Sequence, residues 1–218
     1  MNNVELNIDQ SRSLLLEQLQ KVDGYTNQKP MVKNIGPYDR FTPVIKTTQL
    51  NLEGVPPEKL WFWSDQHFGH KNIIGYANRP FENTMDMQTT MMYNYETTVK
   101  SDDVCIWVGD VAFQSHNIVN AEILNDLPGY KILVIGNHDF GYRTKELIPY
   151  DFDEIHLVLH LRNFIISHHP WWDVPHGWKQ IHGHIHNHKT NNPNHINVSV
   201  EHLDYKPIRF SAILDAHK

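Results

Sequence analysis

Three short, largely apolar runs in this sequence are each followed by a cluster of Asp, Asn or His. The runs cover residues 60–63, 104–108 and 131–135, and the clusters cover residues 65–67, 110 and 137–139. Continuous apolar runs, separated by segments of helical periodicity, predict a largely parallel sheet that is covered on both faces. The carboxyl ends of parallel strands meet at one edge of a sheet, so these clusters are expected to lie together.

From Glu154 onward the pattern changes to short strands with tight turns. We expect these strands at residues 155–159, 164–167, 180–181 and 196–200. They predict a second sheet, mixed or antiparallel, in a protein of the α/β class. Two of the strands are followed by further histidine clusters, at residues 168–169 and 182–186.

Two helices are expected between the strands of the first sheet. Asn83 or Thr84 can cap the first helix. Its apolar residues are Met85, Met92, Tyr95 and Val99. Residues 118–127 are expected to form the second helix. The methionines of the first are interpreted as core residues rather than as contacts to a cofactor.

Residues 1–57 are interpreted as an N-terminal extension, and residues 58–218 as the main domain. Asp9 or Ser11 can cap a helix in the extension, and residues 41–52 alternate as one or two strands. The favoured interpretation is an extra helix with edge strands packed on the domain. The alternative is an arm for partner binding or oligomerisation.

Composition excludes several classes of protein. The 218 residues suffice for one domain with a full core, and the net charge of -6 excludes a global basic field toward nucleic acid or membrane. Cys105 is the single cysteine, so an intrachain disulfide and a cysteine-based zinc site are both excluded. No apolar run approaches 18 residues and the N-terminus lacks a signal sequence, so we expect a cytoplasmic protein without membrane contact.

The histidines point to metal binding. There are sixteen, and they concentrate in the second half of the chain. His184 and His186 are two residues apart, as are Asp65 and His67, so a bent loop can turn both members of each pair toward one ion. Gly183 is expected to leave the backbone free for that bend.

Seven residues are candidate metal ligands. They are Asp65, His67, Asp110, Asn137, His168, His184 and His186. Seven ligands are too many for one tetrahedral ion but suit two ions about 3.5–4 Å apart that share a carboxylate. Oxygen and imidazole donors without thiolate favour two divalent transition-metal ions, with manganese first and iron, zinc or nickel as alternatives.

The ordered set Asp-x-His, Gly-Asp, Gly-Asn-His-Asp, His and Gly-His-x-His resembles the calcineurin-like metallophosphoesterase superfamily. The resemblance spans about residues 59–210, and segments 65–72 and 109–113 are most similar to the small bacterial and phage-encoded members. It implies a four-layer α/β/β/α sandwich of two mixed sheets, with the metal site at one sheet edge. It also implies a metal-dependent phosphoric ester hydrolase.

The resemblance assigns roles to matching positions. Asp65, His67 and His186 would hold one ion, and Asn137, His168 and His184 the other. Asp110 would bridge them. Attack on the phosphorus by a metal-bridging hydroxide would follow. His138 would face the scissile phosphate, where it stabilises charge or protonates the leaving alkoxide, and Asn137 would also contact substrate.

The chain departs from the Ser/Thr protein phosphatase branch in two places. Phe113 and Gln114 replace the acidic residue that orients the catalytic histidine and the arginine that grips phosphate. Asp139 stands where that branch has Glu, and it is a candidate for orienting His138. Without the arginine, a nucleotide or nucleic-acid phosphodiester is a better substrate than a phosphomonoester, and phosphoproteins are disfavoured.

Several residues keep two interpretations. His70 can contact phosphate or cap a helix that starts near Lys71. His169 can replace His168 as ligand, although the first of the pair matches the family. His182 can support a ligand or lie exposed. The tryptophans that can stack on a nucleobase, but are favoured as loop anchors, are Trp171, Trp172 and Trp178.

Two other functions compete with the hydrolase. A catalytically silent scaffold of the same fold, like the retromer scaffold subunit, is expected to lose ligands or the motif histidine. Here His138 and all seven ligands are present. A metal-storage or metal-sensing protein would not need His138 in addition to its ligands.

Overall fold

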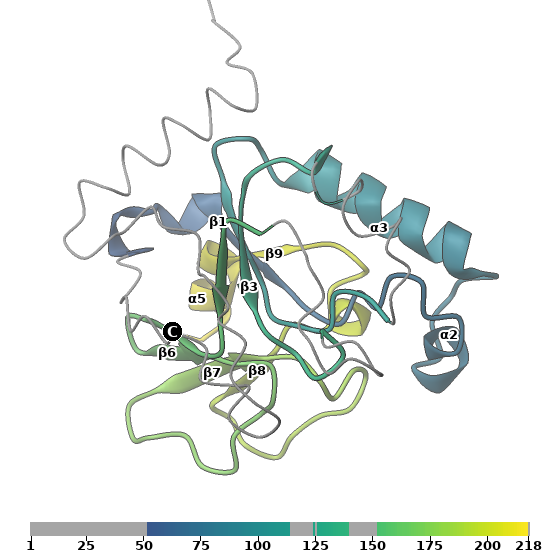
Figure 1. Ribbon diagram of the computed structural model, residues 1–218. Coiled ribbons are helices and arrows are strands. Elements are labelled where there is room, and N and C mark those ends of the chain that lie inside the picture. The colour runs from purple at the N-terminus through teal and green to yellow at the C-terminus, as the bar shows by residue number, and fades with distance from the viewer. Residues whose placement is uncertain (1–51, 114–123, 125, 140–151, 218) are drawn as a thin grey trace, which may run out of the picture.

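The computed structural model describes residues 52–113, 124, 126–139 and 152–217. Two mixed sheets face each other, as Figure 1 shows. The α/β class with two mixed sheets, predicted from the sequence, is confirmed. The expected helix and strands of the N-terminal extension lie outside the described residues, as do Gln114 and most of the helix expected at 118–127.

The first sheet has five strands in the order β4-β3-β2-β1-β9. The parallel members are β1 (Leu60–Trp63), β2 (Val104–Trp107), β3 (Tyr130–Val134) and β4 (Glu154–His156), and β9 (Ile208–Arg209) joins β1 antiparallel. Every residue of β1, β2 and β3 is buried. That burial explains why these strands are apolar on both faces.

The second sheet has four strands in the order β5-β6-β7-β8. They are β5 (Leu159–Leu161), β6 (Phe164–Ile166), β7 (Lys179–His182) and β8 (His195–Asn197). The last three are parallel, and β5 pairs antiparallel with β6. The sheet is therefore mixed.

The single strand expected at residues 155–159 is wrong. The chain leaves the first sheet after His156 and enters the second at Leu159, so β4 and β5 belong to different sheets. The apolar pattern runs through this crossing without a glycine or proline to mark it. The strand expected at 196–200 also ends early, because a 3-10 helix, η3, covers Val200–His202.

The main core lies between the two sheets. Phe62 and Ile106 from the first sheet share one apolar cluster with Ile166 and Ile181 from the second. Helix α5 (Phe210–Ala216), which the sequence reading missed, closes this core. The ring of its Phe210 lies 5.6 Å from that of Phe62.

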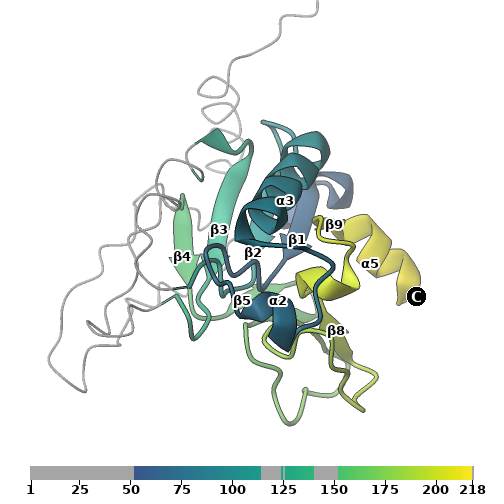
Figure 2. The same ribbon diagram turned by 90° about the vertical axis from the view of Figure 1, so that its right-hand side faces the viewer.

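A second apolar cluster lies on the opposite face of the first sheet, beneath helix α3 (Thr84–Thr98). Figure 2 shows α3 crossing this face, with β4 at one edge of the sheet and β9 and α5 at the other. Asn83 caps α3 by accepting the N–H of Asp86 at 3.0 Å. The buried side of the helix consists of Met87, Gln88, Met91 and Tyr95.

The apolar side expected for α3 is confirmed for Tyr95 and Val99, which are buried, and wrong for Met85. Met85 is 69% exposed, and Met92 is only partly buried. The sequence alternates polar and apolar residues around the helix, so several faces have similar hydrophobicity. Contact with the tryptophans of β1 and β2 decides which methionines are buried.

The outer face of the second sheet is covered by the segment between β6 and β7. The Trp178 ring lies 5.6 Å from that of His160, and the N–H of Trp171 donates to Gln180 Oε1 at 2.8 Å. Two short helical turns, η1 (Leu52–Gly54) and η2 (Pro57–Lys59), precede β1, and α2 (Ile73–Tyr76) follows it. Among all the helices of the described ranges, none is both long and apolar enough to traverse a bilayer.

Candidate metal centre

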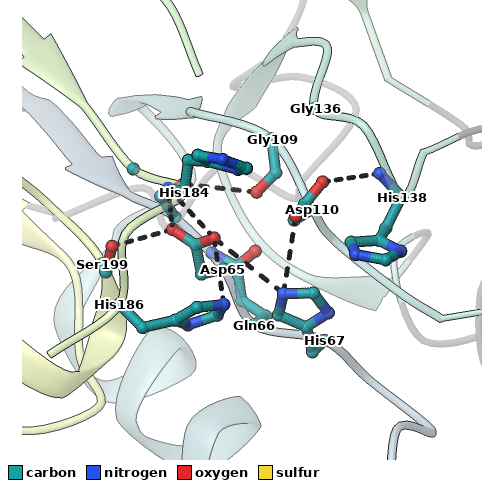
Figure 3. A network of polar contacts seen from close by, with 12 residues as sticks. Asp65, Gln66, His67, Gly109, Asp110, Gly136, His138, His184, His186 and Ser199 are labelled. Carbon is teal, nitrogen blue, oxygen red and sulfur yellow. Dashed lines mark hydrogen bonds and ion pairs between the residues drawn. The ribbon is translucent and has the colours of Figure 1, made fainter. Parts of the chain in front are cut away.

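The predicted ligands come from five strand ends that meet at one side of the two sheets. Asp65 follows β1, Asp110 follows β2 and Asn137 follows β3, while the ends of β6 and β7 supply three histidines. They are His168, His184 and His186. The first two loops are joined by backbone hydrogen bonds, from Asp65 N to Gly109 O and from His67 N to Asp110 O, both 3.0 Å. Figure 3 shows five of these ligands converging, namely Asp65, His67, Asp110, His184 and His186.

Five of the seven predicted ligands have a left-handed backbone. The φ values are 62° at Asp65, 52° at His67, 55° at Asp110, 72° at His184 and 49° at His186. Residues other than glycine seldom adopt positive φ, and such residues concentrate at functional sites. The loops therefore hold these side chains in backbone conformations that the surrounding structure must enforce.

Six of the predicted ligands form two groups that can each hold a metal ion. The first group is Asp65, His67 and His186, and the second is Asp110, His168 and His184. Within each group one donor atom per residue lies within 4.8 Å of the others. The donors are carboxylate oxygen and imidazole nitrogen, a set that suits divalent transition metals.

Asp110 lies where the two groups meet. Its Oδ2 is 3.5 Å from His67 Nε2 in the first group and 3.2 Å from His168 Nε2 in the second. Burial alone would raise the pKa of this carboxyl, but the His168 and His67 imidazoles outweigh it and hold the pKa below its ordinary range. A carboxylate that remains ionised between two groups of donors is placed to bridge two ions.

Asn137 belongs with the second group. Its Oδ1 lies 3.1 Å from His168 Nε2. The other ring nitrogen, His168 Nδ1, lies 2.8 Å from Val108 O, which directs Nε2 toward Asp110 and Asn137. Burial lowers the pKa of His168, but the Asp110 carboxylate outweighs this effect and raises it to about 9.

His67 lacks the hydrogen bonds that a buried imidazole normally makes. It is 1% exposed, and neither ring nitrogen has a hydrogen-bond partner among the described residues. Burial holds the pKa of His67 well below its usual value, so the ring is neutral. A neutral, buried imidazole beside two carboxylates is well suited to a cation.

Asp65 and His186 complete the first group. Asp65 Oδ2 accepts the His184 N–H at 2.9 Å and the Ser199 hydroxyl at 2.8 Å, and Oδ1 lies 3.9 Å from His186 Nε2. His186 Nδ1 lies 3.0 Å from Glu201 Oε1. Glu201 also binds the buried Arg79. Sequence reasoning missed both residues, because neither belongs to a motif nor follows a strand of the first sheet.

The centre is open on one side. Asp65, His67 and His168 are buried, whereas His184 and His186 are half-buried and Asn137 is exposed. The half-buried His138 ring belongs to neither group, and its centroid is 5.2 Å from that of His67. The backbone N–H of His138 donates to Asp110 Oδ1 at 2.7 Å. Its imidazole therefore stands beside the ligands rather than among them.

Asp139 fastens the second and third loops together. Its carboxylate accepts the backbone N–H groups of Gly136 (2.7 Å), Val111 (2.9 Å) and Asp110 (3.0 Å). Burial raises the pKa of Asp139 to about 6, with a further contribution from the Asp110 charge. Among the described residues this carboxylate makes no hydrogen bond to the His138 ring, so its role in orienting that ring stays a prediction.

His70 lies beside His138 rather than at a helix cap. Its ring stacks on Phe113 with centroids 3.8 Å apart, and it lies 6.4 Å from the His138 ring. The N-cap of α2 is Asn72, without a side-chain hydrogen bond to the cap. The His70 Nδ1 is buried with no hydrogen-bond partner in the described ranges, and a contact of His70 with phosphate stays a prediction.

The structure also shows the positions of the other residues that had two interpretations. The exposed His169 stacks against His184 with ring centroids 4.1 Å apart, and it belongs to neither ligand group. His182 is buried rather than exposed. Trp172 is fully exposed, so the favoured interpretation as a loop anchor is wrong for this residue, although Trp178 does pack on the second sheet.

Gly183 is required for a reason other than the bend expected from sequence. A Cβ atom at Gly183 would collide with Ser64 Oγ and Asp65 Oδ2. Its φ is not among the positive values of the described glycines. The missing side chain therefore lets the β7 loop approach the β1 loop, which brings His184 to Asp65.

The chain is similar to proteins of archaea, bacteria and phages, although no family model matches it. It is 37% identical over 167 residues to the uncharacterized protein MJ1445 of Methanocaldococcus jannaschii, covering 72% of this chain and 89% of that protein. The chain belongs to the family of this archaeal protein. The chain is also similar to the gene 66 protein of Mycobacterium phage L5, at 32% identity over a shorter stretch of 81 residues, 36% of this chain and 39% of the phage protein.

A solved structure shares the fold. The protein of unknown function AQ665 from Aquifex aeolicus is similar with a TM-score of 0.57 and 27% identity, over 72% of this chain and 98% of that chain. The Pseudomonas putida nuclease MPE is similar with a TM-score of 0.42 and 18% identity, over 60% of this chain and 63% of that chain.

Proposed function

We propose that the protein is a dinuclear metal-dependent phosphoesterase that prefers phosphodiesters of nucleotides or nucleic acids. The observation that carries this proposal is the position of Asp110, whose Oδ2 lies within 3.5 Å of ligand atoms of both groups. The sequence motifs that resemble calcineurin-like metallophosphoesterases supply the same residues. Both the distances between the ligand atoms and the kinds of donor atom therefore support the binding of two metal ions by these residues.

The residues divide between two ions. Asp65, His67 and His186 would hold the first, Asn137, His168 and His184 the second, and Asp110 both. Two divalent ions in these positions, with manganese first, would polarise a phosphate oxygen and make water nucleophilic near neutral pH. The buried, unsatisfied ring nitrogens of His67 support this fit.

His138 is the proposed proton donor to the leaving alkoxide. Its half-buried ring lies at the open side of the centre. The backbone N–H of the same residue donates a hydrogen bond to Asp110, which fixes the position of the main chain there. An imidazole placed there can donate a proton as the ester bond breaks, or stabilise the charge that develops. Asn137 and His70 are proposed to contact the phosphate, since both stand on the same side as His138.

The proposed preference for a diester rests on Phe113 and Gln114, which stand where the protein phosphatase branch has an acidic residue and a phosphate-binding arginine, and the contacts of Arg79 agree with it. The Arg79 guanidinium is fully buried and donates to Glu201 and to the backbone oxygens of Asp65 and Gln66, so it is unavailable to a substrate. A monoester dianion depends more on a bidentate arginine than a diester monoanion does. Phe113 fills the place of an acidic residue and stacks on His70.

The proposal is tested by hydrolysis of bis-p-nitrophenyl phosphate and of p-nitrophenyl phosphate. The chain is stripped of metal and then assayed with and without manganese, beside the His138→Ala variant. We expect manganese-dependent turnover, faster for the diester and lost in the variant. Two bound ions without turnover of either ester would contradict the proposal and favour a scaffold.

A further inference from the structure

A buried ion pair lies beneath the first ligand group. Arg79 Nη2 and Nε lie 2.7 and 2.9 Å from Glu201 Oε1, and the two side chains are 0% and 4% exposed. Arg79 follows α2, and Glu201 belongs to η3 at the far end of the chain. Burying two charges removes their hydration, so such a pair adds little to stability by itself. A functional reason for it is therefore worth seeking.

Glu201 determines how His186 presents its ring. The same Oε1 that binds Arg79 lies 3.0 Å from His186 Nδ1. A carboxylate at Nδ1 keeps the proton on that nitrogen and leaves the Nε2 lone pair free for a metal ion. His186 Nε2 faces Asp65 Oδ1 in the first group, at 3.9 Å.

Arg79 fixes the backbone that carries the other two ligands. Nη2 donates to Asp65 O at 2.6 Å, and Nη1 donates to Gln66 O at 2.9 Å. These carbonyls belong to the loop in which Asp65 and His67 have positive φ. Two charge-assisted hydrogen bonds hold the peptide planes that this conformation requires.

We propose that the Arg79–Glu201 pair is the positioning device of the first metal site. It connects His186, through Glu201, to the loop of Asp65 and His67, through Arg79. The second group is held by other contacts, namely Val108 O on His168 and the Asp139 carboxylate. The inference rests on the proposed two-ion centre. It requires that loss of the pair lowers the affinity of the first site for its ion and leaves the affinity of the second site unchanged.

The test counts manganese ions bound by the full chain after equilibrium dialysis over a range of metal concentrations. Glu201→Ala should keep one ion near its original affinity and weaken the other by about 10- to 100-fold, as expected for loss of a residue that orients a ligand. Glu201→Gln should weaken it less, because the amide oxygen still accepts from His186. Arg79→Lys should also weaken it, because lysine cannot span both carbonyls.

The matched control is Asp102→Asn. Asp102 pairs with Lys59 at the surface, where the two side chains are 52% and 45% exposed. The variant therefore removes a carboxylate from an ion pair that contacts neither ligand group. It should bind both ions as the original chain does. Glu201→Ala is also combined with His186→Ala to show which site has the lowered affinity. If it is the first site, the double variant should bind the ion of the second site as tightly as either single variant does.

Thermal unfolding in a chelator separates positioning from stability alone. If Glu201→Gln and Arg79→Lys melt earlier but bind both ions within about twofold of the original affinities, the inference is wrong and the two-ion centre stands. If Glu201→Ala does not fold, these two variants carry the test. If the original chain binds no ion, both the inference and the proposed function are overturned.

Discussion

The two halves of the candidate metal centre are supported in different ways. Around the second group the supporting atoms come from the motifs or from strand backbone, as with Asp139 and Val108 O. Around the first group they also include Arg79 and Glu201, which are 122 positions apart and belong to no motif. A motif can therefore contain the ligands of both sites and the support of only one. The predictions below test this contrast between the two sites.

The largest expected effect is that of Asp110→Asn, which breaks both sites together. Asn preserves the shape and the acceptor for the His138 N–H but removes the charge that both ions would share. We expect loss of both bound ions and a fall in diester hydrolysis of at least about a thousandfold, since the metal chemistry depends on the pair. Ion counting and the manganese assay measure this. A variant that keeps full activity would show that the two sites are independent.

His138→Ala should separate chemistry from metal binding. The backbone N–H that binds Asp110 remains, so both ions should bind with unchanged affinity. Turnover should fall by about 10²- to 10⁴-fold, the usual contribution of a positioned acid or base. The turnover rate at saturating diester is measured beside the ion count. Loss of an ion in this variant would instead identify the ring as a ligand.

Gly183→Ala should disturb the junction between the sites. The new Cβ would collide with Asp65 Oδ2 and Ser64 Oγ, so the β7 loop must move. We expect a loss of roughly 1–3 kcal/mol in unfolding free energy, as for overpacking, and about tenfold weaker metal binding. Denaturant unfolding and dialysis measure these effects. Gly75→Ala, with no neighbouring atom within 4 Å, is the control; it should leave metal binding unchanged and should not lower the unfolding free energy.

The smallest expected effect is the release of protons when metal binds. In the metal-free chain the raised pKa of His168, about 9, keeps its ring protonated at pH 7, whereas the lowered pKa of His67 keeps that ring neutral. A ligating nitrogen must lose its proton, so filling the second site at pH 7 should release about one proton from His168, and affinity should rise from pH 7 to pH 9. Calorimetry in buffers of different ionisation enthalpy measures the release. Equal affinity at both pH values would contradict this.

The parallel sheet and the convergence of the ligands could be predicted from sequence because both have local signals. Leu60–Trp63 and the runs like it are largely apolar, and the polar residues that follow them must meet at one edge. The fold class followed from these runs. Ligand spacing alone, as in Asp65 and His67, also indicated which side chains share a loop.

Other features depend on contacts that no local pattern encodes. The phase of α3 is decided by the tryptophans beneath it, which bury Met91 and leave Met85 exposed. The crossing after His156 depends on which sheet has room for the next strand. Arg79 and Glu201 have ordinary surface residue types, and only the tertiary structure brings them together beneath His186.

The left-handed backbone at the ligands also limits which residue types these positions tolerate. Glu is as good a metal ligand as Asp, yet Asp, Asn and His are several-fold enriched among the non-glycine residues that accept positive φ. At Asp65 and Asp110 the φ values are 62° and 55°. The choice of the shorter carboxylate at both positions is thus made by the main chain as much as by the ion. Exchanging Asp for Glu in this family would change the loop before it changed the coordination.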